Sequence, residues 1–404
     1  MPKLHPSPAA KKAIVLGTLC SFSYLAVYVA RNILGAVSPQ IEAAGVFNKD
    51  FIGTLSSIYF ICYAVGQLIN GLIGDRVKAK YMISLGLIFA GICNFPIPFL
   101  SDYPIAVYVT YGATGFFLAM IYAPMTKVVA ENTEPLYATR CSLGYTFASF
   151  FGSPLAGIMA SLLVWSSVFT SSSALLVGMG LICFIVFTYF EKKGYVEYGK
   201  YKPQECSLIS SIKVLLKRQI VKFTLISALT GVIRTSVVFW LTTFFSEYLG
   251  YSPETAASLY TVATLFISSS AFISVFVYER LKQNMDLTIL LSFAVSAISF
   301  LLVYLLRQPV LTIGFIVLAV ICGDSASTML WSRYCPSLVD TGVVSGATGY
   351  LDFTSYMAAA LSSTLFAGAV SSIGWSGLIL VWFGLMALGV VISLPYGKFV
   401  KKTP

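Results

Sequence analysis

The chain carries, from Ala13 to Val37, the apolar stretch AIVLGTLCSFSYLAVYVARNILGAV. As a helix this stretch is longer than the ~30 Å hydrocarbon core of a bilayer. It contains one charge, Arg31, and no acidic residue precedes that arginine in the chain. Placing a guanidinium in hydrocarbon costs at least ~2.5–3.5 kcal/mol on insertion scales. We therefore expect Arg31 to face a cavity or a partner rather than lipid.

Two tyrosines accompany this arginine. Tyr24 and Tyr28 precede Arg31 by seven and three residues, which places all three side chains on one face of a helix. A guanidinium and two phenols on one face form a stripe that can bind an anion. The alternative is an arginine that snorkels from a helix end toward water, although the apolar run continues beyond it to Val37.

The composition is that of an integral membrane protein. Hydrophobic residues make up 57 % of the 404 residues, charged residues make up 10 %, and the mean hydropathy is +0.84. Soluble domains carry about 25 % charged residues. The net charge of +10 would indicate nucleic acid binding in a soluble protein, so its meaning depends on where the basic residues fall.

Hydropathy predicts twelve membrane spans, and hence an all-α membrane protein. The predicted spans are residues 13–38, 51–73, 81–100, 104–127, 140–164, 167–190, 220–246, 254–277, 286–306, 309–331, 342–369 and 374–395. If the N-terminus is cytoplasmic, 22 of the 26 basic residues fall on the cytoplasmic side. This asymmetry follows the positive-inside rule. We expect a multi-pass protein of the cell (inner) membrane with both termini cytoplasmic, with the bilayer and not nucleic acid as its partner.

The two halves of the chain repeat one plan. Arg234 in the seventh span corresponds to Arg31 at an offset of 203 residues. The polar segment 191–219 separates six spans from six spans, so we expect two pseudo-symmetric six-helix bundles, residues 1–190 and 220–404, joined by a cytoplasmic linker. Such parallel repeats with a binding site at the midplane are typical of alternating-access transporters.

A charged loop motif also repeats. Asp75 and Arg76 follow the second span, and Glu279 and Arg280 follow the eighth at an offset of 204 residues. The sequence from Gly71 through Asp75 and Arg76 resembles the cytoplasmic loop signature of the major facilitator superfamily. The resemblance implies a cytoplasmic gate formed by these residues, because an aspartate can face a helix N-terminus and basic residues can pair across the seam. A purely topogenic role for the basic residues is the alternative.

Within that superfamily, the chain resembles the organophosphate:phosphate antiporters. Tyr24-x-x-x-Tyr28-x-x-Arg31 is similar to the family's first-span substrate stripe, and GFFxxMxYxP, Gly115 to Pro124, to its fourth span. The segment from Gly346 to Tyr356, followed by Gly374-Trp375, is similar to the eleventh span and the loop after it. The resemblance implies that Arg31 and Arg234 jointly hold a phosphate group. It also implies a lining role for three further side chains: Gln67, Tyr122 and Tyr356.

Three positions depart from the family pattern. Asn32 stands where the family commonly has a lysine, Gln67 replaces a lysine of the second span, and Phe151 replaces a histidine of the fifth. The pocket thus lacks three groups that would support a dianion.

Two acids lie inside predicted spans, Asp324 in the tenth and Asp352 in the eleventh. An acid within the membrane is by default a functional hypothesis. It could neutralise Arg234 in the empty site, carry a proton, or bind the ammonium group of a zwitterion. A structural ion pair is the further alternative.

The sequence thus predicts a transporter that binds a small anion and exchanges it, without cofactor or metal, as a monomer. Proton-coupled symport of a carboxylate or zwitterion, and a transporter-like ligand sensor, stay open as alternatives. An enzyme is not expected, because no nucleophile–base or metal-ligand spacing occurs.

Overall fold

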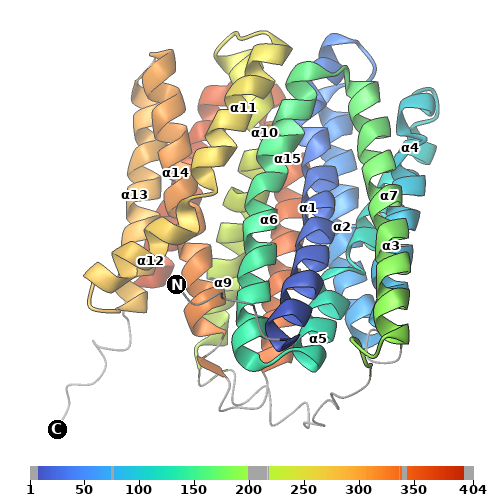
Figure 1. The fold of residues 1–404 in the computed structure, drawn as a ribbon. Coiled ribbons are helices and arrows are strands. Elements are labelled where there is room, and N and C mark those ends of the chain that lie inside the picture. The colour runs from blue at the N-terminus through green and yellow to red at the C-terminus, as the bar shows by residue number, and fades with distance from the viewer. Residues whose placement is uncertain are drawn as a thin grey trace, which may run out of the picture. The chain divides into compact units, whose positions relative to one another are not determined.

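The structure, a computed structural model, describes residues 8–73, 77–198, 216, 218–306, 308–335, 337–338 and 344–394 (Figure 1). Throughout this part of the chain every regular element is a helix. Ten stretches within it are long and apolar enough to cross a membrane. One of them, Ala347–Ser393, covers two predicted spans and breaks at Gly374, whose φ is 69° and ψ is 176°. With the helix Pro135–Leu162, a helix is found for each of the twelve predicted spans.

The contacts divide the chain into two compact units. Unit 1 comprises residues 1–203 and 252–261, and unit 2 comprises residues 204–251 and 262–404. The expected boundary at residues 191–219 stays a prediction. The helices of residues 1–203 are α1 (Pro8–Ala43), α2 (Lys49–Ile73), α3 (Ala79–Asn94), the short η1 (Ile97–Phe99), α4 (Pro104–Leu118), α5 (Tyr122–Asn132), α6 (Pro135–Leu162) and α7 (Trp165–Lys192).

Helix α1 packs chiefly against α6, and the two lie side by side in Figure 1. Glycines on α6 permit this approach. A Cβ atom at Gly144 would lie 2.7 Å from Ser21 Oγ, closer than real Cβ contacts. In lipid no hydrophobic effect drives helices together, so close packing contributes much of their association. Small residues at the helix interface let the backbones approach closely.

The predicted fourth span is broken, whereas the fifth is continuous. Helix α4 ends at Leu118 and α5 begins at Tyr122. Pro124 explains the break, because it has no N–H to donate to the carbonyl of Met120 four residues earlier. Pro154 lies inside α6, which continues through it.

The second half of the chain contains π-helical segments within its spans. Its elements are α9 (Ile220–Gly231), η2 (Val232–Val237), α10 (Val238–Thr243), η3 (Phe244–Tyr248), α11 (Pro253–Ile267), α12 (Ser270–Arg280), α13 (Met285–Leu305), α14 (Pro309–Met329), η4 (Leu330–Tyr334) and α15 (Val344–Ser393). Here η2, η3 and η4 are π-helical. Such segments are rare and often mark functional sites.

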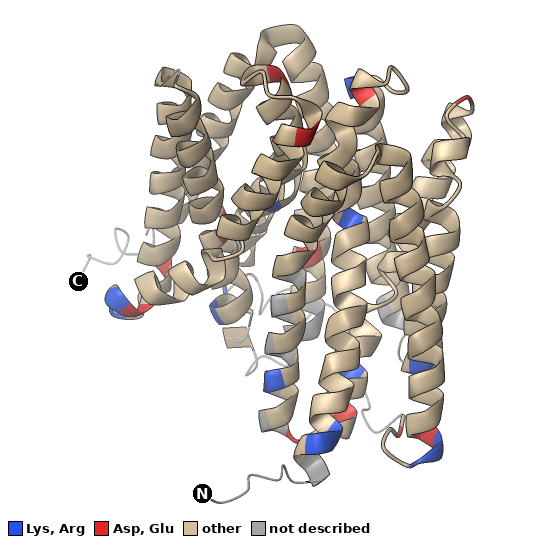
Figure 2. Ribbon diagram, turned by 45° about the horizontal axis from the view of Figure 1, so that its top comes forward, with Lys and Arg blue, Asp and Glu red and all other residues tan. Residues whose placement is uncertain are grey.

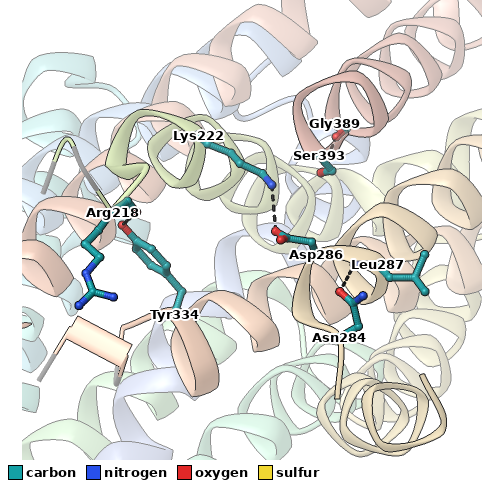
Figure 3. Close-up of polar contacts among 8 residues, drawn as sticks. All are labelled: Arg218, Lys222, Asn284, Asp286, Leu287, Tyr334, Gly389 and Ser393. Carbon is teal, nitrogen blue, oxygen red and sulfur yellow. Dashed lines mark hydrogen bonds and ion pairs between the residues drawn. The ribbon is translucent and has the colours of Figure 1, made fainter. Parts of the chain in front are cut away.

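Polar contacts at one end of unit 2 join the starts of α9 and α13 to the end of η4 (Figure 3). Lys222 pairs with Asp286 at 2.9 Å, and the Tyr334 hydroxyl donates to the carbonyl of Arg218 at 3.0 Å. Asn284 caps α13 by accepting a hydrogen bond from the backbone N–H of Leu287. The sequence predicts this end to be cytoplasmic.

Figure 2 shows most of the charged residues near helix ends or in the connections between helices. Within the described residues, the middles of the helices are largely free of them. This distribution fits a multi-pass membrane protein. Which side is cytoplasmic remains the prediction made from the basic-residue asymmetry.

Candidate functional site

Arg31 is buried in unit 1 among aromatic rings, with only 7 % of the residue exposed. Its guanidinium carbon lies 5.3 Å from the ring centroid of Tyr28, 5.4 Å from that of Phe60 and 5.5 Å from that of Tyr63. These distances fall within the ~6 Å range of cation–π attraction. Arg31 is therefore held inside the unit, as expected, and does not snorkel toward water.

The predicted tyrosine stripe is present. The rings of Tyr24 and Tyr28 meet edge to face at 4.9 Å, and Tyr122 from the start of α5 lies 5.3 Å from Tyr24. Gly152 on α6 makes room for this stripe, because a Cβ there would lie 2.9 Å from the backbone carbonyl carbon of Tyr28. Three tyrosines from two separate spans are thus brought together, and one of them, Tyr28, lies beside Arg31.

The sequence reasoning missed Phe60 and Tyr63 on α2. Both are buried, at 3 % and 1 % exposure, and their spacing places them on one helix face. The motif Tyr59-Phe60-x-x-Tyr63 within the second span was the available signal. Gln67 lies four residues after Tyr63 and is half-buried. Its role in binding remains a prediction.

Arg234 lies in unit 2, in the π-helical segment η2, and is half-buried. Its guanidinium interacts electrostatically with the carboxylate of Asp324 on α14. Gly323 allows this approach, because a Cβ there would lie 2.8 Å from Ile233 Cγ2. The structure therefore brings together one predicted arginine and one predicted acid.

Serines surround that acid. The Ser270 hydroxyl, at the start of α12, donates to Asp324 Oδ2 at 2.5 Å. Ser325 Oγ donates to the Ser270 carbonyl at 3.3 Å, and Ser274 Oγ donates to the Ser325 carbonyl at 2.9 Å. The sequence reasoning missed Ser270, although a run of three serines at 268–270 interrupts the eighth span.

Asp352 and Tyr356 lie one helical turn apart on α15. Tyr356 is 3 % exposed and Asp352 is half-buried. Cys335, just beyond η4, interacts electrostatically with Asp352 and forms a hydrogen bond with Thr348. Burial is the main cause that raises the pKa of the Cys335 thiol, and the Asp352 charge adds to it. Roles for Asp352 and Tyr356 in substrate binding remain predictions.

The gate residues are only partly described. Gly71 lies in α2, whereas Asp75 and Arg76 fall outside the described residues. Glu279 and Arg280 are exposed at the end of α12.

Within unit 1, Glu191 at the end of α7 pairs with two lysines, Lys78 and Lys80, that follow the loop motif in the sequence. Lys78 Nζ lies 2.6 Å from Glu191 Oε1, and Lys80 pairs with the other carboxylate oxygen. Sequence reasoning did not identify this pair of contacts.

The chain after α7 is attached to α5. The Asn132 amide donates to the Glu197 carbonyl and accepts from the Glu197 N–H, each at 2.8 Å. The next residue, Tyr198, lies under Lys78 Nζ, 5.7 Å from its ring centroid. Burial and the nearby Glu191 charge raise the pKa of Tyr198 well above its usual range, so it stays a neutral phenol.

The described residues contain no group of three or more histidine, cysteine or acidic side chains placed to hold a metal ion. What the two arginine sites offer is therefore charge, hydrogen bonds and aromatic surface. Such groups bind and orient an anion.

Relatives of this chain include transport and sensor proteins. Over 71 residues it is 37 % identical to the membrane sensor protein UhpC of Escherichia coli (strain K12), a match that covers 18 % of this chain and 16 % of that protein. It is 21 % identical to a phosphoglycerate transporter protein of Salmonella typhimurium over 92 % of this chain and 85 % of the relative. The name of the second relative, a phosphoglycerate transporter, agrees with the resemblance to organophosphate carriers.

The fold has solved counterparts. The crystal structure of a D-xylose–proton symporter superposes with a TM-score of 0.71, at 12 % identity, over 96 % of this chain and 98 % of that one. At this identity the likeness concerns the fold alone. Residues 20–363 match the Major Facilitator Superfamily. The chain belongs to the Major Facilitator Superfamily.

Proposed function

We propose that the protein is a secondary transporter that carries a small organophosphate or related organic anion across the membrane by exchange. Arg31 and Arg234 are proposed to bind the anionic group, with Tyr24, Tyr28 and Tyr122 as neighbours of the first arginine. The observation that carries this proposal is the burial of Arg31 inside an apolar unit. A cation held at such cost in a membrane protein indicates a functional site.

The aromatic surroundings support anion binding in unit 1. The rings of Tyr28, Phe60 and Tyr63 hold the guanidinium through cation–π contacts, which do not neutralise its charge. The guanidinium has five N–H donors, and its planar fork matches phosphate or carboxylate oxygens bidentately. The phenol of Tyr28 adds a hydrogen-bonding group next to it.

The position of Arg234 supports the same role in the second half. It occupies a π-helical segment, where an extra residue per turn re-aims side chains, and it corresponds to Arg31 at an offset of 203 residues. One relative, the phosphoglycerate transporter protein, matches 92 % of this chain.

Exchange follows from the cost of desolvating cations. Closing an empty site around the Arg31 guanidinium removes it further from water without a bound anion to compensate, which is costly. A bound anion lowers that cost, so the loaded protein changes state more readily than the empty one. Transport then proceeds in both directions only with cargo, which is exchange.

The test is flux in proteoliposomes. Vesicles loaded with unlabelled phosphate or glycerol phosphate should take up the labelled compound, whereas empty vesicles should not. Arg31→Lys and Arg234→Lys should each lose most of this counterflow. The control is Arg140→Lys on α6, an exposed arginine over the Tyr137 ring. Equal uptake in loaded and empty vesicles would contradict exchange.

A second candidate function is ligand sensing, favoured by the 37 % identity to a membrane sensor protein over 71 residues. A sensor binds the anion with little flux. Ligand-induced thermal stabilisation of the purified protein together with absent counterflow would select this candidate over transport.

A further inference from the structure

Asp324 occupies a defined position beside Arg234 in unit 2. Gly323 packs against Ile233, so the residues that follow each of them, Asp324 and Arg234, are brought within electrostatic reach. A larger residue at 323 would force the Ile233 side chain on η2, or the helices themselves, to shift. The approach of acid and arginine is thus built into the helix packing.

The carboxylate is also held from a third element. Ser270 donates to Asp324 Oδ2, and its own carbonyl accepts a hydrogen bond from Ser325, the neighbour of the acid. Ser274 binds the Ser325 carbonyl one turn further along α12. These bonds fix the start of α12 on α14, so the carboxylate cannot swing away from η2 without breaking the Ser270 contact.

The other charged groups on the elements packed against α14 lie at helix ends. They are Lys222 on α9, Glu279 and Arg280 on α12, Asp286 on α13, and Arg333 on η4, whose guanidinium lies over the Tyr278 ring. Lys222 and Asp286 pair with each other, as Figure 3 shows. Arg234 is therefore the cation whose charge Asp324 offsets.

An arginine within electrostatic reach of a carboxylate can still donate hydrogen bonds to a ligand, because its guanidinium has five N–H groups. Its net charge, however, is compensated. A ligand oxygen that approaches this arginine also meets the field of the carboxylate, and unit charges a few ångströms apart interact strongly at low dielectric. Each added negative charge on the ligand is therefore opposed.

We propose that Asp324 is a specificity-determining residue that makes the site select singly charged phosphoryl groups over doubly charged ones. This inference rests on the proposed function and names its substrate class: phosphodiesters, or phosphomonoesters in their monoprotonated form. The acid acts by repelling the second charge, which is selection against the wrong ligand rather than attraction to the right one.

The experiment compares two ligands that differ by one charge. Glycerol 3-phosphate is a dianion at pH 8, because the second phosphate pKa is about 6, whereas its methyl diester is a monoanion at any such pH. Dissociation constants of both are measured by ligand-induced thermal stabilisation of the purified full chain. The quantity of interest is the monoester constant divided by the diester constant.

The wild type should bind the diester more tightly at pH 8. Asp324→Asn should lower the ratio about tenfold, equivalent to ~1.4 kcal/mol. Asp286→Asn, the matched change at the Lys222 pair, should leave the ratio within about twofold of the wild type. An unchanged ratio in folded Asp324→Asn overturns the inference. Wild type that binds neither ester nor inorganic phosphate overturns the proposed function itself, and the inference with it.

A second measurement needs no variant. Between pH 8 and pH 5 the monoester gains a proton and becomes a monoanion, while the diester keeps its charge. The wild-type ratio should therefore fall about tenfold over this range. The diester constant reports any titration of the protein's own groups. A ratio that rises as the pH falls overturns the inference even if Asp324→Asn does not fold.

Discussion

The surroundings of Arg31 and Arg234 differ, although the two arginines occupy corresponding positions in the repeat. Arg31 is held by the rings of Tyr28, Phe60 and Tyr63. Arg234 lies in a π-helical segment beside Asp324, which Ser270 holds in place. Rings attract a cation without cancelling its charge, whereas a carboxylate cancels it.

The difference indicates a division of labour between the halves. We propose that unit 1 supplies attraction for an anion and unit 2 supplies discrimination. In this repeat the arginine keeps its position while its surroundings differ, and such surroundings can set specificity.

The largest expected effect is on stability. Its absence would contradict the difference proposed between the surroundings of Arg31 and Arg234. Arg234→Gln leaves the Asp324 carboxylate without its nearby cation. Removing one partner of a fully buried pair costs about 3–5 kcal/mol, and because both residues here are half-buried we expect at most about 3 kcal/mol. Arg31→Gln removes a cation from the rings of Tyr28, Phe60 and Tyr63, and because cation–π contacts are weaker than a charge pair it should cost less. Thermal unfolding midpoints in detergent measure both. The double variant Arg234→Gln/Asp324→Asn should recover most of the loss, and a double variant as unstable as the single would contradict the pairing.

The next effect concerns ligand affinity. Lysine keeps the charge but loses the guanidinium fork, so Arg31→Lys and Arg234→Lys should each weaken anion binding. If both arginines act on one ligand, the double variant should lose little more than either single, a departure from additivity of ~0.5–3 kcal/mol. Dissociation constants of the three variants decide this, with Arg140→Lys as control. Strictly additive losses would mean two independent sites.

A smaller effect tests the aromatic surroundings. Tyr63→Leu removes one ring from Arg31 while keeping apolar bulk, and should weaken anion affinity and stability by ~0.5–2 kcal/mol. Phe51→Leu, which removes a ring stacked on Tyr108 at 4.5 Å, is the matched control on α2. It should leave affinity unchanged, and an equal loss of affinity in both variants would show that the rings act through packing alone.

The smallest effect sharpens the assignment of the second acid. Burial and the Asp352 charge raise the pKa of Cys335, which limits the reactive thiolate. Asp352→Asn should lower that pKa and speed alkylation of Cys335 at pH 8 about twofold. Peptide-resolved mass spectrometry measures the rate, and Asp286→Asn is the control. A rate that does not change would place Asp352 away from this thiol.

The spans and the two arginines were predictable because they depend on local signals. Apolar length and isolated charge need no tertiary information, and the repeat offset places Arg234 without a structure. The sequence could not indicate which acid lies near Arg234, because Asp324 and Asp352 both lie deep in spans of the same half. The packing of Gly323 on Ile233 shows that Asp324 approaches Arg234.

Contacts between spans account for the rest of what the sequence did not reveal. Phe60 and Tyr63 resemble ordinary apolar lining until α2 is placed beside α1. The break of the fourth span followed from Pro124, but Pro154 has the same chemistry and leaves α6 continuous. Local propensity therefore gives the element and tertiary packing decides its shape.

The double hydrogen bond between Asn132 and the Glu197 backbone has a mechanical consequence. These bonds attach the chain that leaves α7 to Asn132, the last residue of α5. A force applied to the chain beyond Glu197 is therefore transmitted to α5 as well as to the end of α7. Helix α5 is a rod about 15 Å long. Its opposite end begins with Tyr122, whose ring rests against Tyr24. Tension applied outside the bundle is thus delivered, along a single stiff helix, to the aromatic stripe next to the buried arginine.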